Sequence, residues 1–153
     1  MRSIPILALA FMLAFSTTGC DTVTEIAELA AFRAAVGCTT IGEITLGQTV
    51  NGSLTMSDCR VSTDQTFIDY FAFRVSSATT VQIDLQSDDF DAYLMLFSSN
   101  GTVLEEDDDG GEDFNSRIVR SMAPGLYVIG ANSLDEGETG AYTLSAASAS
   151  PTR

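Results

Sequence analysis

The sequence predicts an all-β protein, an antiparallel sandwich or barrel of about eight strands. Two observations support this class. Between residues 38 and 148, apolar and polar side chains alternate with the period of two that marks a strand with one buried face. Turn signals rich in Gly, Pro, Asn and Asp interrupt the alternation about every 8 to 12 residues. The same stretch has no helical period, and 153 residues suffice for one domain with short extensions.

Residues 1–19 are predicted to be a signal peptide. Arg2 supplies a positive charge, and the apolar run 4–15 is too short to span a bilayer, which needs about 20 residues. The letters STTGC that follow resemble the lipobox of bacterial lipoproteins, in which Cys20 would carry lipid and begin the mature protein. Thr17 departs from that motif, which usually has Leu there, so simple secretion is the alternative. The lipid would hold the chain at the periplasmic face, the outer membrane or the cell surface.

Residues 20–37 are predicted to be a spacer between the lipid and the domain. Residues 21–36 contain good helix formers and neither Gly nor Pro. Ile26, Leu29 and Val36 recur on roughly one helical face. A short, partly helical spacer is expected, with a disordered tether as the alternative.

Eight stretches within residues 38–148 carry the strand signal. The clearest is TVQIDLQ, in which Val81, Ile83 and Leu85 are expected to face the core. An Asn-Gly turn at 99–101 should join two strands as a hairpin, and residues 149–153 should form a frayed tail. The predicted strands are 41–55 (with Gly47 and Gly52 as breaks or bulges), 67–75, 80–86, 92–97, 102–106, 117–122, 126–132 and 141–146.

The three cysteines support export. If Cys20 carries lipid, Cys38 and Cys59 remain as a pair. In an oxidising compartment, a disulfide between them would close a loop of about 20 residues and contribute roughly 3 kcal/mol. Two free, buried thiols are the alternative, and no CxxC motif or histidine points to zinc or redox chemistry.

The charge of the chain excludes some partners and reactions. All seven basic residues are Arg, there is no Lys or His, and the net charge is -14. Such a chain repels nucleic acid and anionic lipid and attracts cations, although an acidic surface also serves solubility alone. Without His, no Ser-His or Cys-His catalytic pair can form.

Two acidic segments flank the predicted hairpin and point to calcium. Asp89 and Asp91 enter its first strand, and Asp107, Asp108 and Asp109 leave its second strand, so both segments should meet at one end. Calcium takes oxygen ligands of this kind, and it would stabilise carboxylates that otherwise repel one another. The alternative is a solvated acidic loop in which Asp91 caps a turn.

Three residues near these segments are candidates for ligand contact. Phe90 and Phe114 stand among charged residues in loops, whereas Tyr70 and Tyr142 fit a core better. Arg117 is the third candidate. Its alternative role, together with Arg120, is to pair with Asp113 or Glu112, which would contribute only about 0–1 kcal/mol if exposed.

Short motifs follow one another in a characteristic order along residues 41–146. They are Asp89-Phe90-Asp91, Tyr93-Leu94, Asn100-Gly101, Asp108-Asp109, Gly110-Gly111 and Ser116-Arg117-Ile118, with GEITLGQTVNGSLT and DYFAFRV before them and APGLYVIGAN and GAYTLSA after them. Together they resemble the bacterial pre-peptidase C-terminal (PPC) domain. The resemblance implies a jelly-roll-like β-sandwich that is non-catalytic and assists secretion or binds matrix or polysaccharide. Related collagen-binding modules carry structural calcium.

The chain departs from this family in two ways. The domain is expected to stand alone, without an attached peptidase, and Asp107 occupies a position that is often Asn. We therefore expect a non-catalytic, membrane-anchored module that binds polysaccharide or protein at the cell envelope, with calcium as a stabilising ion. The alternatives are a purely structural envelope lipoprotein and a glycosidase that uses Asp89 and Asp109. The absence of Trp, which often lines sugar clefts, disfavours the glycosidase. The sequence predicts no oligomeric state.

Overall fold

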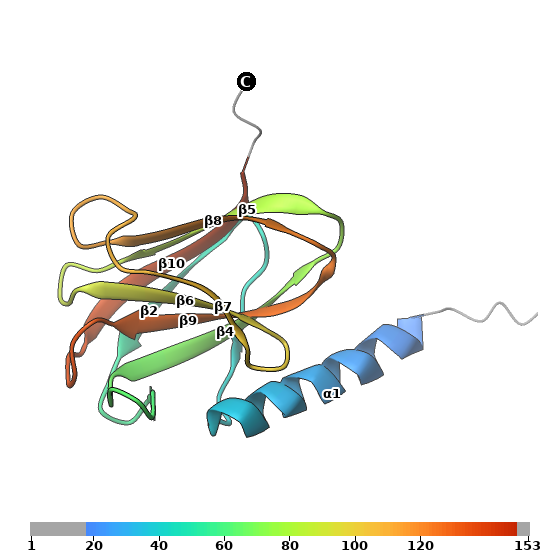
Figure 1. Cartoon of the computed structure of the whole chain (residues 1–153), viewed down its shortest axis with the longest axis horizontal. Coiled ribbons are helices and arrows are strands. Elements are labelled where there is room, and N and C mark those ends of the chain that lie inside the picture. Colours follow the sequence, from blue (N-terminus) through green and yellow to red (C-terminus); the bar gives the residue numbers. More distant parts are fainter. Residues whose placement is uncertain (1–17, 150–153) are drawn as a thin grey trace, which may run out of the picture.

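The computed structural model describes residues 18–149, which form two stacked β-sheets with one helix on the outside (Figure 1). The predicted signal peptide therefore lies almost entirely outside the described residues, as does most of the predicted tail. The helix is α1 (Thr18–Val36), and it includes Cys20, the predicted site of lipidation. Among the described residues, no helix is long and apolar enough to cross a membrane.

Within residues 18–149, ten strands form the sheets. They are β1 (Gly42–Glu43), β2 (Gln48–Leu54), β3 (Cys59–Arg60), β4 (Phe67–Val75), β5 (Thr79–Gln86), β6 (Ala92–Ser98), β7 (Val103–Asp107), β8 (Ser116–Met122), β9 (Gly125–Ser133) and β10 (Gly140–Ser148). Each of the eight predicted segments holds one of the longer strands. The additional strands β1 and β3 have two residues each and pair with β4. Strands this short carry no alternation that a sequence reading could detect.

The strands are divided between two separate sheets, so the protein is a sandwich and not a barrel. One sheet has the order β1-β4-β9-β6-β7, with β3 also paired to β4, and the other has the order β2-β10-β5-β8. All pairs except β1–β4 are antiparallel. From β4 to β10 the chain passes repeatedly between the sheets, which agrees with the predicted jelly-roll-like class.

The main core lies between the sheets, and β5 shows how it is built. Val81, Ile83 and Leu85 are at most 1% exposed, while the residues between them face outward. The predicted alternation in this strand is confirmed. The predicted hairpin is also confirmed, because β6 and β7 pair across a turn in which Gly101 has a φ of +86°.

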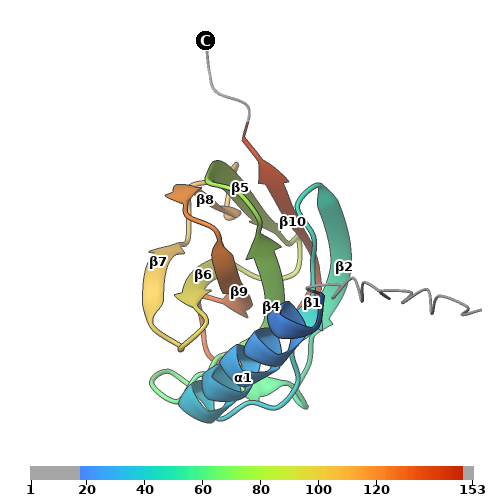
Figure 2. The same ribbon diagram turned by 90° about the vertical axis from the view of Figure 1, so that its right-hand side faces the viewer.

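Helix α1 packs on the outer face of the six-stranded sheet (Figure 2). The strands beneath it are apolar on both faces. In β4, Phe73 and Val75 belong to the core between the sheets, whereas Tyr70 and Ala72 belong to a second cluster under the helix. Phe32 of α1 lies in this second cluster and is 0% exposed. Residues 18–36 therefore form a helix whose C-terminal half packs on the sheet, in place of the alternative of a disordered tether.

The predicted disulfide joins Cys38 and Cys59, and their Cα atoms are 5.9 Å apart. Cys38 lies two residues after the end of α1 and Cys59 begins β3, so the bond ties the end of the helix to the sheet that it covers. The alternative of two free thiols is not observed.

Gly47 and Gly52 have different roles, although both were predicted as breaks or bulges. Gly47 precedes β2 with a φ of +95°, in the left-handed region that glycine adopts most easily, and it is a true break. Gly52 lies inside β2 instead. A Cβ atom there would overlap the ring of Tyr142, its partner on β10, so this position leaves room for that ring.

Candidate functional site

Three acidic loops meet at one end of the sandwich, on the left in Figure 1. We call them the acidic rim: residues 87–91, 107–115 and 134–139, which hold eleven of the 21 acidic residues and no basic one. Backbone hydrogen bonds tie the loops 107–115 and 134–139 to residues 91–92, where the first loop leads into β6. Ala92 N donates to Phe114 O over 3.1 Å, and Leu134 N donates to Asp91 O over 2.9 Å. The prediction that the two acidic segments meet is confirmed by these contacts.

Two of the five predicted calcium ligands serve as structural acceptors. The carboxylate of Asp89 accepts a hydrogen bond from Ala141 N over 2.7 Å. The carboxylate of Asp107 accepts from Gly110 N over 2.8 Å and from Arg117 N over 2.7 Å. Each of these carboxylates uses one oxygen, Oδ2, to fix a loop to a neighbouring strand, so both have a structural role.

Asp91 is in the opposite situation. Its Oδ1 atom is buried and has no hydrogen-bond partner in the described part of the chain. Burial raises the pKa of this carboxyl group, and the charges of Asp109, Asp108 and Asp135 raise it further. Asp135 belongs to the loop 134–139, whose acidic, Gly-rich sequence was a signal that the two-segment prediction left out. A protonated carboxyl group or a nearby cation would relieve this site.

Within residues 18–149, no group of three or more carboxylate or cysteine side chains is close enough to hold a metal ion as the loops stand. Asp91, Asp108, Asp109 and Asp135 interact electrostatically, but they are not gathered into a finished coordination shell. Calcium therefore stays a prediction, and its ligands would come from these four residues.

The two candidate aromatic residues differ sharply in exposure. Phe114 is 67% exposed, and it follows Asp113, whose φ of +57° is unusual for a residue other than glycine. Phe90 is only 6% exposed, and its ring packs at 6.5 Å from that of Tyr142 in the core. The prediction that Phe90 contacts a ligand is therefore wrong, because the loop turns this side chain inward.

The arginines beside the rim also have partners other than those expected. Arg117 pairs with Asp84 across β8 and β5, and Arg120 pairs with Glu105 at 2.9 Å. The expected pairing with Asp113 or Glu112 is wrong, because the antiparallel register places Asp84 directly opposite Arg117.

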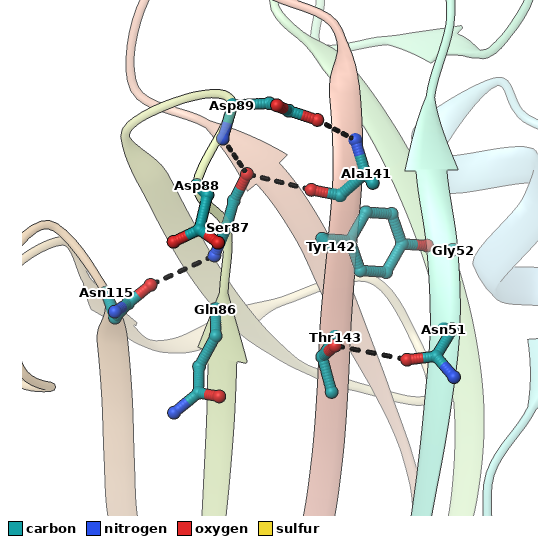
Figure 3. Close-up of a pocket in the computed structure, with 10 residues that line it drawn as sticks. All are labelled: Asn51, Gly52, Gln86, Ser87, Asp88, Asp89, Asn115, Ala141, Tyr142 and Thr143. Carbon is teal, nitrogen blue, oxygen red and sulfur yellow. Dashed lines mark hydrogen bonds between the residues drawn. The ribbon is translucent and has the colours of Figure 1, made fainter.

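A pocket of about 680 Å³ adjoins the rim on the side of the four-stranded sheet (Figure 3). Its volume falls within the range of about 300 to 1,000 Å³ that is usual for ligand sites. The residues that line it are Asn51, Gly52, Gln86, Ser87, Asp88, Asp89, Asn115, Ala141, Tyr142 and Thr143. The sequence reading missed this pocket, because three strands distant in sequence supply its side chains.

The walls of the pocket are held by a network of hydrogen bonds. Ser87 Oγ donates to Ala141 O over 2.9 Å and accepts from Asp89 N over 3.1 Å. Asn115 Oδ1 accepts from Ser87 N over 2.9 Å. Thr143 Oγ1 lies 3.1 Å from Asn51 Oδ1. The pocket is therefore a preformed, polar hollow.

The fold and the two surfaces define a β-sandwich module with an acidic loop end and a polar side pocket. Its fold is similar to that of the pre-peptidase C-terminal domain of a collagenase from Bacillus anthracis, with 20% sequence identity and a TM-score of 0.56. This match covers 70% of the present chain and 94% of the other. The predicted resemblance to the PPC domain is thus confirmed at the level of fold.

A second similar structure is PliG from Aeromonas hydrophila, a periplasmic inhibitor of g-type lysozyme. It shares 13% identity with a TM-score of 0.50, and the match covers 71% of the present chain and 96% of the other. No family model matches the chain, and no curated protein matches it either.

Proposed function

We propose that this chain is an exported, lipid-anchored, non-catalytic module that binds a basic protein at the cell envelope through its acidic rim. The observation that carries the proposal is Phe114, a large aromatic side chain that is 67% exposed in the rim segment 107–115. Exposed aromatic residues are enriched among the anchors of protein interfaces. The surrounding carboxylates would steer a positively charged partner toward this anchor.

The similarity to PliG supports a protein as the partner. PliG is an inhibitor of an enzyme, and the structural match to this chain covers 96% of the PliG chain. An inhibitor acts by binding another protein, so this fold is compatible with such a role. The first partner to test is accordingly a g-type lysozyme.

Three features support export and anchoring. The Cys38–Cys59 disulfide is typical of a protein in an oxidising compartment. The lipobox-like STTGC segment would place a lipid on Cys20. Val23 and Ile26, on the half of α1 next to that cysteine, are 68% and 67% exposed. These apolar side chains fit a helix end that lies close to a lipid surface.

A non-catalytic role is supported by the state of the carboxylates. The chain has neither His nor Lys. The glycosidase alternative needs a pair of carboxyl groups on either side of a sugar bond, and one oxygen of Asp89 is already used to fix its loop to Ala141 N. A purely structural lipoprotein remains the competing proposal, and it is separated from a binding module by the experiment below.

Phe114→Ala is expected to weaken binding of a g-type lysozyme by about tenfold or more, because it removes the exposed anchor. The free energy of unfolding should change by less than about 0.5 kcal/mol, because the side chain is largely in solvent. Surface plasmon resonance at several salt concentrations would measure the affinity, which should fall as salt rises.

The matched control is Val119→Ala, a change of another exposed apolar residue on β8, outside the rim. It should leave the affinity unchanged. An unrelated basic protein should bind more weakly, without dependence on Phe114. Equal affinity for the wild type and the Phe114 variant, or no binding at all, would contradict the proposal.

Calcium is a second candidate ligand of the rim, favoured by one observation. The buried, unpartnered oxygen of Asp91 lies near three other carboxylates, and a divalent ion would neutralise their repulsion. We propose that Asp91, Asp108, Asp109 and Asp135 supply the ligands. Asp89 and Asp107, which were part of the predicted set, would instead keep their structural hydrogen bonds.

Asp91→Asn is expected to increase the free energy of unfolding in chelator by up to about 1 kcal/mol, because it removes repulsion between partly exposed charges. The effect depends on pH. A raised native pKa favours the protonated form, so the contribution of Asp91 to stability is present in acid and is lost as pH rises through that pKa. As pH rises through this pKa, the free energy of unfolding should fall more for the wild type than for the variant. Urea titrations at several pH values would measure the difference.

Addition of millimolar calcium should raise the melting temperature of the wild type and leave that of Asp91→Asn unchanged. Glu28→Gln, a change of an acidic residue on the distant helix α1, is the control and should respond like the wild type. A wild-type protein whose melting temperature is indifferent to calcium would rule out the metal.

A further inference from the structure

The polar pocket beside the rim contains a row of side chains that the protein-binding proposal does not use, namely Asn51, Gln86 and Thr143. We propose that it binds a neutral, polyhydroxylated saccharide segment. This inference goes beyond the proposed function and can fail independently of it, because Phe114 does not line the pocket.

The first argument is the placement of three outward side chains in a row. Thr143 of β10 pairs with Asn51 of β2 on one side and with Gln86 of β5 on the other. Neighbouring strands lie about 4.8 Å apart, so the row extends about 10 Å across the sheet. Such a row matches an extended ligand with hydrogen-bonding groups at regular intervals.

The second argument is which groups remain unused. The side chains of Gln86 and Asp88 make no hydrogen bond within the described part of the chain. Asn51 accepts a hydrogen bond with its Oδ1 atom, which leaves its NH₂ group to donate. Gln86 can both donate and accept, and Asp88 can accept. Hydroxyl groups of a sugar also both donate and accept, so they satisfy this set.

The third argument is the rigidity of the wall. Asn115 and Ser87 hold the loop over the pocket, and both have their own hydrogen bonds satisfied by the protein. Tyr142 lies beneath, 3% exposed, with its hydroxyl 2.7 Å from Asp69. The loop and the strands that carry the ligand-facing side chains are therefore fixed before binding, which lowers the entropic cost of association.

The charge of the pocket selects among saccharides. Asp88 and the adjoining rim are negative, and the row itself has no basic residue. Phosphate, sulfate and uronate groups would be repelled there. Tyr142 is buried and offers no open ring face for stacking. The pocket can therefore bind a ligand through hydrogen bonds with neutral hydroxyl or N-acetyl groups.

The experiment is an NMR titration of the ¹⁵N-labelled protein with chitotriose and maltotriose as neutral probes and trigalacturonate as the anionic probe. A neutral trisaccharide should shift the amide signals of the pocket residues, including Thr143 and Gln86. Trigalacturonate should shift them much less. Absence of shifts with both neutral probes at millimolar concentration would overturn the proposal, as would equal binding of trigalacturonate.

The variant Asn51→Ala/Gln86→Ala should weaken this binding by about tenfold or more, because two hydrogen-bonding side chains are lost. Gln82→Ala is the matched control: it removes the same kind of side chain from the same face of β5, outside the pocket. It should bind like the wild type. An equal loss in the control would place the ligand elsewhere and refute the assignment. The rim variant Phe114→Ala should keep saccharide binding, which separates this proposal from the protein interface.

Discussion

Phe32→Ala should lower the free energy of unfolding by about 3 to 5 kcal/mol, as is usual for a fully buried phenylalanine. Phe32 is 0% exposed, and its ring centroid lies 5.2 Å from that of Tyr70 and 5.6 Å from that of Phe97, with the rings edge to face. Alanine would leave a cavity between α1 and the six-stranded sheet. Urea denaturation followed by circular dichroism would measure the loss.

Tyr70 provides a second measurement of the same contact. Burial raises the pKa of Tyr70 to about 12. If the helix loosens, water reaches this hydroxyl and its pKa should fall toward the ordinary value of about 10. Spectrophotometric titration of the tyrosines would detect the change.

The control for this substitution is Phe114→Ala, the same change at an exposed position. It should leave both the stability and the Tyr70 titration unaltered. A loss below about 1 kcal/mol for Phe32→Ala, with an unchanged Tyr70 pKa, would mean that α1 is not packed on the sheet in solution.

Replacement of both Cys38 and Cys59 by serine should lower the free energy of unfolding by about 3 kcal/mol, because the open loop of about 20 residues gains entropy in the unfolded chain. The loss should be at least this large, since Cys38 is also buried at 3% exposure and serine places a polar group there. Thermal and urea unfolding would measure it.

Reduction of the wild-type protein should reproduce most of that loss, whereas the double serine variant should be indifferent to the reductant. Cys20→Ser is the control, because this residue is not part of the disulfide. Reaction of the folded, unreduced protein with a thiol reagent at Cys38 or Cys59 would contradict the bond.

Local patterns in the sequence were sufficient for the framework of the sandwich. The alternation of Val81, Ile83 and Leu85 identifies a strand and its buried face because neighbouring side chains in a strand point to opposite sides. Asn100 and Gly101 identify the hairpin, and the hairpin brings the acidic segments on either side of it to one end. Counting three cysteines, with Cys20 assigned to lipid, left Cys38 and Cys59 as the candidate pair, and the structure decided between a disulfide and two free thiols. Each of these conclusions depends on residues that are close in sequence or few in number.

The packing of α1 on the outer face of the six-stranded sheet could not be predicted from local sequence patterns alone. Tyr70 and Ala72 make the second face of β4 apolar, and Met95 and Phe97 do the same for β6. A strand that is apolar on both faces must be covered on both, and this signal could have predicted a packed α1. The pattern alone does not say which segment supplies the cover, because that choice depends on chain connectivity and packing.

By itself, the sequence determined that this chain is antiparallel β, and it predicted the Cys38–Cys59 disulfide and two acidic segments that meet at one end. Only the tertiary structure decided that Phe90 turns inward, that Arg117 pairs with Asp84, and that Asp135 completes the electrostatic environment of Asp91. It also brought Asn51, Gln86 and Thr143 into one row beside a pocket. The physical reason is that periodicity and turn chemistry act between neighbouring residues. Ion pairs, burial and pockets arise instead from strand register and loop packing, which join residues far apart in the chain.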